Sequence, residues 1–415
     1  MTTEQQIQEL KDLLYRKTGP SPVGTSGYTI VRNTINNYSV KEESRIFEAI
    51  VDVDGRADYT SLEDAIDYVL SIGGGDIFVR AGTYTISRNI ATITKPINII
   101  GVNSALAIID FNSTARNFVI NSGTAYTTGT ISSITGTAVV GSSTSWNGNV
   151  TAGQYMLVGT RWYLIAVVVD DTHITLAEAF DEKNVSFAAN YRIVTLTRNI
   201  LFESLTIKNS TGTAIAVTDC RDFFLNDVVL LTNNKGFVLT GVSSVTITSA
   251  IVAGSTSNGW EMTNCGLLTI RGLAAAGNGG HGGVISNVEA GGFSNCASNA
   301  NTSDGLNITS GFDLDLNYLA NSNGGQGIEL VATNNAIRMI DCSARSNTSD
   351  GIKLTASSDY CKIIGGHFDT NGGWGINVAA ATDDKNVVVG NSFNGNVSGT
   401  ITDSGTGTVS ASNTT

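Results

Sequence analysis

Two acidic residues in the C-terminal half lie at the spacing that brings alternate side chains to one side of a β-strand. Asp313 and Asp315 alternate in the segment GFDLDLNY. On an extended strand their side chains would lie about 7 Å apart. This separation suits the acid and base of an inverting glycosidase, or two ligands of a shared divalent cation. Although solvated carboxylates on an exposed strand are the simpler alternative, we take both residues as candidate catalytic residues.

A second candidate group contains a histidine. His367 and Asp369 alternate in GGHFDTNGGWG, and Trp374 follows in the same segment. An imidazole and a carboxylate on one face can exchange a proton with a sugar, and an exposed indole can stack on the sugar ring. A solvated histidine at a strand edge is the alternative. His367 and Asp369 are therefore candidate catalytic residues, and Trp374 is a candidate carbohydrate-binding residue.

Aromatic side chains cluster in a separate segment, at Trp146, Tyr155, Trp162 and Tyr163. Aromatic rings bind sugars by stacking, while neighbouring polar groups bind the hydroxyls. Trp146, Trp162 and Tyr163 are thus candidate carbohydrate-binding residues. The same residues could instead form the core of a small β module, and the sequence leaves both interpretations open.

The composition favours turn-rich β structure and excludes several partners. The 415 residues include 46 Gly and only 3 Pro, and 14% are charged. A net charge of −12 argues against nucleic acid, because phosphate backbones require clustered Lys and Arg. No apolar segment reaches the roughly 18 residues needed to cross a bilayer, so we expect no membrane insertion.

The cysteines do not suggest a disulfide framework or a zinc site, because they are widely spaced and form no CxxC pair. We expect them to be small buried side chains. They are Cys220, Cys265, Cys296, Cys342 and Cys361. No metal site and no cofactor is predicted, although the sequence leaves a divalent cation open.

A repeat that begins at Gly212 specifies the elements that must position the candidate residues. Glycine recurs in steps of 22 to 24 residues, and this period indicates a solenoid. Asn-rich segments such as NTSDG precede the glycines. Asn and Gly tolerate the left-handed conformation of tight corners, and stacked Asn side chains can bond between turns. The repeated glycines are Gly212, Gly236, Gly259, Gly283, Gly305, Gly327, Gly351 and Gly375.

Strand alternation in the repeat Gly-Ile-x-Leu sends Ile and Leu inward and the residue x outward. The outward column comprises Ala216, Val238, Glu261, an unassigned residue near Ile285, Asn307, Glu329, Lys353 and Asn377. Glu261 and Glu329 are three turns apart, about 14 Å, which is too far for a glycosidase pair. They remain candidate carbohydrate-binding residues. Lys353 is expected to form an exposed ion pair with Glu329.

Two other segments carry a resemblance to known proteins. Residues 58–110 place Leu62, Ala65, Ile66 and Val69 on one helix face and continue through VRAGTYTI and KPINIIG. This segment resembles the start of pectin-lyase-like β-helix proteins, where a helix caps the open end of the coil. Residues 124–196 contain alternating strands with Gly, Asn-Gly and Asp-Asp turns, and they resemble modules of bacteriophage tail proteins. His281 lies in a Gly-His-Gly similar to that of polygalacturonases, but the acidic residues that accompany it there are missing upstream.

We therefore predict an all-β fold: a right-handed parallel β-helix solenoid with an N-terminal capping helix and an inserted small antiparallel β module. The predicted parts are an amphipathic helix and attachment segment at 1–50, the start of the β-helix with its capping helix at 51–123, the module at 124–196, the β-helix coils at 197–394, and a Gly/Ser/Thr-rich tail at 395–415. The first helix carries Ile7, Leu10 and Leu13. The tail is expected to be disordered, or ordered only by an oligomer partner.

Three functions fit these features. The first is a phage tailspike-like or fibre-like virion protein, a homotrimer that binds host-surface polysaccharide and attaches to the virion through its N-terminal segment. The second is a polysaccharide depolymerase, a hydrolase or lyase, on the same scaffold. The third is a bacterial surface adhesion β-helix, for which a signal is expected. Because the start MTTEQQIQEL is unlike a secretory signal, we favour the first, made in the host cytoplasm and acting at the host cell surface.

Overall fold

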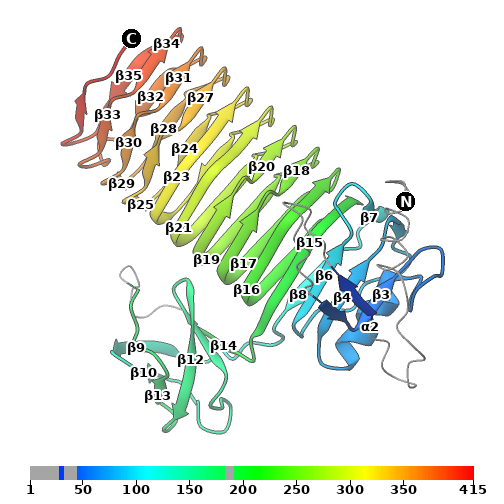
Figure 1. Ribbon diagram of the computed structural model, residues 1–415. Coiled ribbons are helices and arrows are strands. Elements are labelled where there is room, and N and C mark those ends of the chain that lie inside the picture. Colours follow the sequence, from blue (N-terminus) through cyan, green and yellow to red (C-terminus); the bar gives the residue numbers. More distant parts are fainter. Residues whose placement is uncertain (1–27, 32–43, 183–190) are drawn as a thin grey trace.

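The protein is a long parallel β-solenoid with a smaller antiparallel sheet beside it (Figure 1). The computed structural model describes residues 28–31, 44–182 and 191–415. The predicted helix within the first 16 residues lies outside the described residues. The coils stack side by side into a rod that ends at the C-terminus (Figure 1). The predicted all-β class and parallel solenoid are confirmed.

Each coil presents three strand faces, which we name from the coil that contains strand β16. Face A is formed by residues 215–218, face B by residues 223–226 and face C by residues 228–231, each with the residues paired to it in the other coils. Every face pairs in parallel register with the next coil: Ile215 opposes Phe237, Phe223 opposes Val245, and Val229 opposes Ile251. The three faces enclose one continuous apolar core.

The strands differ in length because in some coils adjacent faces join into one strand. The first coils comprise β3 (Ala49–Val51), β4 (Gly75–Val79), β5 (Gly82–Thr85), β6 (Ile97–Gly101), β7 (Ala107–Thr114) and β8 (Phe118–Asn121). The central coils comprise β15 (Thr197–Ser210), β16 (Thr213–Leu231), β17 (Lys235–Thr248), β18 (Ile251–Ala253), β19 (Trp260–Arg271), β20 (Ala274–Ala276), β21 (Gly283–Asn299), β22 (Leu306–Ile308) and β23 (Gly311–Asn321). The later coils comprise β24 (Ile328–Leu330), β25 (Asn334–Asn335), β26 (Arg338–Ile340), β27 (Ser343–Arg345), β28 (Ile352–Leu354), β29 (Ser358–Asp359), β30 (Lys362–Ile364), β31 (His367–Asp369), β32 (Trp374–Val378), β33 (Val387–Val389), β34 (Ser392–Asn394), β35 (Gly399–Asp403) and β36 (Val409–Ala411).

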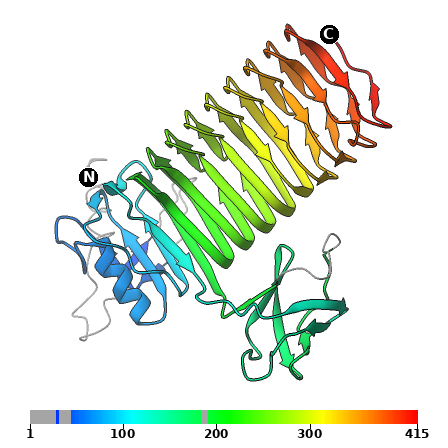
Figure 2. The same cartoon turned by 180° about the vertical axis from the view of Figure 1, so that it is seen from behind.

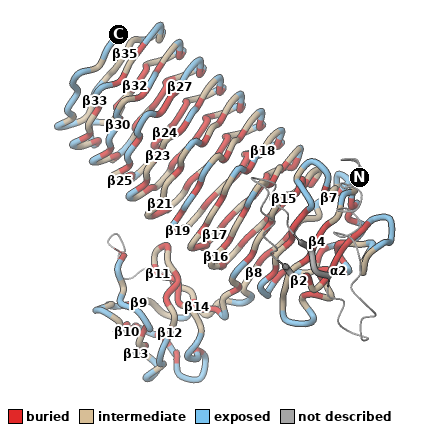
Figure 3. The backbone as a smooth tube through the Cα atoms, in the orientation of Figure 1, coloured by how far each residue is buried: buried red, intermediate tan, exposed pale blue. Residues whose placement is uncertain are grey.

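Side chains inside the rod stack from coil to coil. Trp260 is fully buried between Phe237 and Phe293, with ring centroids 5.9 and 6.0 Å away. Alternation of buried and more exposed residues along the strands is visible over the whole rod (Figure 3). All five cysteines are buried and free, as expected, and burial raises the pKa of the Cys265 thiol to about 12. These thiols act as small apolar core groups.

The predicted asparagine stack is confirmed, and it lies next to the left-handed corners rather than in them. The side chain of Asn347 accepts from the backbone N–H of Asn323 at 3.0 Å and donates to Oδ1 of Asn371 at 3.0 Å. The corner residue just before it, Ser346, has φ 54°. Buried amides that bond both to backbone and to each other satisfy the polar groups of the turn. The stack runs through Asn278, Asn301, Asn323, Asn347, Asn371 and Asn396.

The N-terminal end of the rod is covered by helix α2 (Leu62–Ser71), as the sequence predicted (Figure 2). Ser61 caps the helix by accepting from the backbone N–H of Asp64. Leu62, Ala65, Ile66 and Val69 are fully buried in the solenoid core. Beside them, β1 (Tyr28–Val31) and β2 (Ser44–Phe47) form an antiparallel pair. No helix among the described residues is long and apolar enough to span a membrane.

The inserted antiparallel module is also confirmed. It has the strand order β14-β11-β12-β13-β10-β9, with its own apolar core. Its strands are β9 (Thr130–Thr135), β10 (Ala138–Ser142), β11 (Tyr155–Val158), β12 (Arg161–Val168), β13 (His173–Leu176) and β14 (Arg192–Val194). It leaves the solenoid after β8 and returns at β15, so the coils on either side of it pair directly, as Ile215 with Phe118 shows.

The C-terminal tail differs from its prediction. Residues 399–403 form β35 and pair in parallel with β32, and residues 409–411 form β36 and pair with β33. Asn413 also bonds to Asn391 and continues a column of stacked amides. The tail is therefore the last coil of the solenoid, because its backbone finds a complete template in the preceding coil and needs no other chain.

Candidate functional site

The outward column of face A is confirmed by the strand register, which pairs Glu261 with Val284, Val284 with Asn307, and Glu329 with Lys353. The unassigned member is Val284. Gly282 rather than Gly283 repeats Gly259, since Trp260 opposes Gly283. Glu261 and Glu329 are separated by Val284 and Asn307, so the structure does not bring them together.

Both glutamates of this column pair with lysines. Lys235 Nζ lies 2.7 Å from Glu261 Oε1, and Lys353 Nζ lies 3.5 Å from Glu329 Oε1. The predicted ion pair of Glu329 with Lys353 is present. Each ion pair holds the glutamate side chain in one position on the strand. The carboxylate can then accept hydrogen bonds from a hydroxyl-rich ligand.

A second polar column, which we name the turn column, lies beside the first. It contains the residues just before the repeated glycines. Each member accepts from the backbone N–H of the next member: Asp304 from Gln326 at 2.7 Å, Gln326 from Asp350 at 2.6 Å, and Asp350 from Trp374 at 2.7 Å. This ladder fixes the side chains and stabilises the turns. Its members are Asn258, His281, Asp304, Gln326, Asp350 and Trp374.

The turn column brings a second carboxylate to Glu329. Nδ2 of Asn307 lies 2.9 Å from Asp304 Oδ2 and 3.3 Å from Glu329 Oε2, so both carboxylates share one amide donor. Nδ1 of His281 lies 3.2 Å from Asp304 Oδ2. The result is a partly buried group of two carboxylates, an imidazole and a lysine on adjacent coils.

The surroundings drive the pKa values of the two carboxylates apart. Burial raises the pKa of Glu329, and the charge of Asp304 raises it further. Burial alone would raise the pKa of Asp304, but hydrogen bonds from His281, Asn307 and the Gln326 amide outweigh it, so that pKa is lowered. Neighbouring carboxyl groups whose pKa values are shifted in opposite directions are the arrangement that acid–base catalysis uses.

The sequence interpretation missed this pair because it treated NTSDG only as a turn and found no adjacent carboxylates in the outward column. The signal was nevertheless present. Asp304 stands one residue before a repeated glycine, Gly305, and Glu329 stands two residues after the next one, Gly327. Positions on the two sides of a glycine become neighbours when the coils stack in register.

The His367, Asp369 and Trp374 group is not brought together. His367 and Asp369 do share one side of β31 on face C, where His367 Nδ1 lies 2.6 Å from Ser392 Oγ and Asp369 Oδ2 lies 3.2 Å from Arg345 Nε. Trp374 stands in the turn column beside face A. The indole therefore lies on a different part of the coil from His367 and Asp369.

Asp313 and Asp315 do not form the straight-strand pair that the sequence suggested. Asp313 has φ 50° and sits at the corner before face B, so alternation does not continue through it. Asp315 points outward on face B, and its carboxylate binds the guanidinium of Arg338 on the next coil through two contacts. Within the described residues, no group of three or more His, Cys, Asp and Glu side chains is arranged to hold a metal ion.

The three aromatic candidates of the module are buried. Trp146 is fully buried and donates its indole N–H to Tyr191 at 2.9 Å. Tyr163 contacts Asp181, and Trp162 donates to the carbonyl of Gly241 at 2.8 Å. They form the module core and its contact with the solenoid. The open-surface interpretation of Trp146, Trp162 and Tyr163 is thus corrected, because their ring faces are covered by protein.

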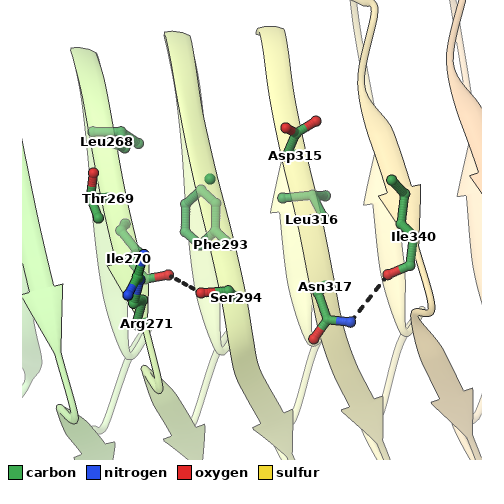
Figure 4. A pocket seen from close by; sticks show the side chains of 11 residues that line it. Leu268, Thr269, Ile270, Arg271, Phe293, Ser294, Asp315, Leu316, Asn317 and Ile340 are labelled. Atoms are coloured by element: carbon green, nitrogen blue, oxygen red, sulfur yellow. Dashed lines mark hydrogen bonds between the residues drawn. The ribbon is translucent and has the colours of Figure 1, made fainter.

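The surface of face B carries two adjacent depressions. One, of about 460 Å³, lies over Asn98, Glu203, Asn226 and Thr248. The other, of about 380 Å³, lies over the next coils, and its lining residues come from neighbouring strands (Figure 4). Thr248 opposes Arg271, which joins the two depressions along the rod. The second is lined by Leu268, Thr269, Ile270, Arg271, Gly292, Phe293, Ser294, Asp315, Leu316, Asn317 and Ile340.

The linings of both depressions suit a hydroxyl-rich chain. Asn226 and Thr248 lie on two successive coils, Arg271 lies on the next one, and Ser294 and Asn317 lie on the two coils after that. Apolar atoms of Leu268 and Ile340 lie among them. Sugars need both kinds of group, polar atoms for the hydroxyls and apolar surface for the C–H faces. The repeat of the coils places such groups about every 4.8 Å along the rod.

Comparison with known proteins identifies the fold. Residues 193–365 match the family model described as a right-handed β-helix region. A search of curated proteins gives no match. Among solved structures, the A-module of the mannuronan C-5 epimerase AlgE4 of Azotobacter vinelandii shares 14% identity, with 84% of this chain and 94% of that chain covered, at a TM-score of 0.50.

Two further solved structures are similar. The catalytic domain of a GH87 alpha-1,3-glucanase in complex with tetrasaccharides shares 11% identity, with 85% of this chain and 67% of that chain covered, at a TM-score of 0.51. The tailspike gp61 of the Pseudomonas phage phi297 shares 11% identity, with 79% and 72% covered, at a TM-score of 0.42. Identities this low concern the fold alone. The match to the family model over residues 193–365 and the parallel strand topology show that this chain folds as a right-handed parallel β-helix.

Proposed function

We propose that this protein binds an extended polysaccharide along face B. The observation that carries the proposal is the pair of adjoining depressions on that face, which together follow the rod over consecutive coils. Their hydroxyl, amide and apolar lining matches the chemistry of sugar rings. The fold fits the same role, since the mannuronan epimerase and the alpha-1,3-glucanase with similar folds act, by their names, on polysaccharides.

We further propose that the protein is a virion tailspike or fibre that binds host-surface glycan as a homotrimer. An apolar column on the surface supports the trimer. Face C carries an outward column in which Ile251 and Leu319, three coils apart, are 43% and 46% exposed. Small residues Ala274 and Ala297 lie between them, so the column is flat and apolar. The attachment segment at 1–50 lies largely outside the described residues and stays a prediction.

Binding can be tested with the full chain and a panel of surface polysaccharides, using calorimetry. Thr248→Trp fills the first depression, and we expect it to reduce affinity at least tenfold. Val387→Trp adds the same bulk to face B outside both depressions and should bind like the unmodified protein. Equal affinity of all three proteins would exclude face B as the binding surface.

The trimer has its own test. Light scattering on the full chain should give three times the mass of the 43.4 kDa chain. A charge placed on the apolar column by Ile251→Glu together with Leu319→Glu should lower that mass to one chain without unfolding the rod. A single-chain mass for the unmodified protein would contradict the trimer while leaving glycan binding intact.

Cleavage of the polysaccharide is a second candidate function, favoured by the Asp304–Glu329 pair. The two carboxylates lie within reach of one amide and have pKa values shifted in opposite directions. In such a pair Glu329, whose pKa is raised, would give a proton to the leaving glycosidic oxygen, and Asp304, whose pKa is lowered, would take a proton from the water that attacks the sugar carbon. His281 and Lys353 would hold the two groups in place.

A further inference from the structure

Gly292 lies in the middle of the second depression, and neither its backbone nor its packing requires a glycine. Its φ is outside the left-handed region, and a Cβ added to it would meet no atom within 4 Å. Every other described glycine with such open space has a left-handed φ. Because glycine weakens a strand and often marks the close approach of a ligand, the missing side chain at position 292 points to something that approaches from outside.

The strand register shows what surrounds this gap. Gly292 lies between Thr269 and Asp315 in one outward row of face B. The parallel row holds Arg271, opposite Ser294, with Asn317 on the following coil. Figure 4 shows Arg271, Ser294 and Asn317 along one side of the pocket and Asp315 on the other side. The gap is thus a hollow with a guanidinium, a hydroxyl and an amide on one flank.

Arg271 is the unpaired cation of this hollow. Its side chain is exposed and forms no hydrogen bond or ion pair with the residues that the structure describes. Asp315, which lines the same depression, is already bound to Arg338. All other arginines whose side chains the structure describes have a protein acceptor: Arg56, Arg80, Arg88, Arg116, Arg161, Arg192, Arg198, Arg221, Arg338 and Arg345.

We propose that the hollow over Gly292 is a subsite for one acidic sugar of the bound polysaccharide, whose anionic group binds Arg271. This inference rests on the proposed glycan binding and names the class of glycan. The ring would lie over Gly292, where a side chain would block it, and Ser294 and Asn317 would bind its hydroxyls. A guanidinium offers two parallel N–H donors, which match the two oxygens of a carboxylate or of a phosphate. The chain as a whole has a net charge of −12, which repels anions. The unpaired Arg271 would therefore attract an acidic sugar to this depression in particular.

The test compares three polymers with the full chain by calorimetry: a polyuronate, the same polymer after reduction of its carboxyls, and a phosphate-bearing teichoic acid. Arg271→Gln should weaken binding of one acidic polymer at least tenfold and leave the reduced polymer unchanged. The acidic polymer that loses affinity identifies the anionic group. Arg271→Lys keeps the charge but not the two-point geometry, and should recover only part of the loss. Lys362→Gln, which removes a positive charge from face B outside the hollow, is the matched control.

A second variant tests the hollow itself. Gly292→Trp should abolish binding of the acidic polymer without lowering the melting temperature, because its side chain enters open space. If Arg271→Gln and Gly292→Trp both bind the acidic polymers as tightly as the unmodified protein, the subsite is overturned. If the unmodified protein binds none of the three polymers and none of the surface polysaccharides tested above, the proposed function itself fails, and the two failures are thereby distinguishable.

Discussion

The indole N–H of Trp162 donates to the backbone carbonyl of Gly241, with 2.8 Å between nitrogen and oxygen. Trp162 lies on β12 of the inserted module, and Gly241 lies at a corner of the solenoid. Near them, Arg192 Nη2 lies 2.7 Å from Asp219 Oδ1, and Thr160 packs where a Cβ of Gly266 would stand. The module is therefore docked on the coils by buried polar contacts, in addition to its two chain connections.

Trp162→Phe should loosen this docking. The substitution keeps an aromatic ring but removes the only donor of the indole, which leaves the buried Gly241 carbonyl without that bond at a cost of about 1–3 kcal/mol. Hydrogen exchange should become faster in β11, β12 and β14 and stay unchanged in β28 and β32 of the later coils. The exposed Val169→Ala serves as control. Unchanged exchange in the module would show that the chain connections alone hold it in place.

Glu182 gives the docked module a dependence on pH. Burial raises its pKa to about 7 from 4.5, and the charge of Glu289 adds to the effect. Between these values the folded protein holds a proton that the unfolded chain has released. Stability should therefore fall as pH rises from about 4.5 to 7 and stay level above it, by an amount on the order of 3 kcal/mol.

Thermal unfolding of Glu182→Gln tests this dependence. The amide oxygen still accepts from the Thr160 N–H, which the carboxylate binds at 3.0 Å, so the fold should be retained. At pH 8 the variant should melt at a higher temperature than the unmodified protein, and at pH 4 the two should coincide. The exposed Glu178→Gln should leave the difference between pH 4 and pH 8 in place. A pH slope equally steep in both variants would assign it to another group.

Asn347→Ala should destabilise the later coils. The side chain makes four contacts: its oxygen accepts from the Asn323 backbone and side chain, and its nitrogen donates to the Ala320 carbonyl and to Asn371. The residue is 2% exposed, so water cannot replace the hydrogen bonds that its partners lose. The free energy of unfolding should therefore fall by about 2–4 kcal/mol. Chemical denaturation measures it. Asn394→Ala, at an exposed position, should change stability by less than about 0.5 kcal/mol.

The features that local pattern determines could be predicted. Alternating apolar residues specified the strand faces, and the helix with Leu62 and Ile66 specified the cap, because each depends only on neighbours in sequence. Features that depend on the register between coils could not be predicted from the sequence. Asp313 falls on a corner and not on a straight strand, and Trp162 is covered by a coil far along the chain. The Asp304–Glu329 pair and the open Gly292 are likewise properties of stacked coils.

The Asp304–Glu329 pair predicts which substitutions would stop cleavage of a polysaccharide. Glu329→Gln removes the group whose raised pKa keeps a proton available, so release of oligosaccharides should fall by roughly 10²–10⁴-fold. Activity of the unmodified protein should decline as pH rises through that raised pKa, since the acid is then lost. Asp304→Asn should have a similar effect, while its side-chain oxygen still accepts from the Gln326 N–H and preserves the turn.

The earlier candidates provide the controls for this prediction. Asp313→Ala alters a corner carboxylate, and Asp315→Ala breaks the exposed contact with Arg338. Neither touches Asp304 or Glu329 in the described structure. Asp313 also lies outside both depressions of face B, so Asp313→Ala should keep full oligosaccharide release and lose at most about 1 kcal/mol of stability. If Asp315→Ala stops release and Glu329→Gln does not, catalysis belongs to face B and the turn column is purely structural. Because Asp315 borders the Gly292 hollow, that result would also place the cleaved bond next to the acidic sugar bound at Arg271.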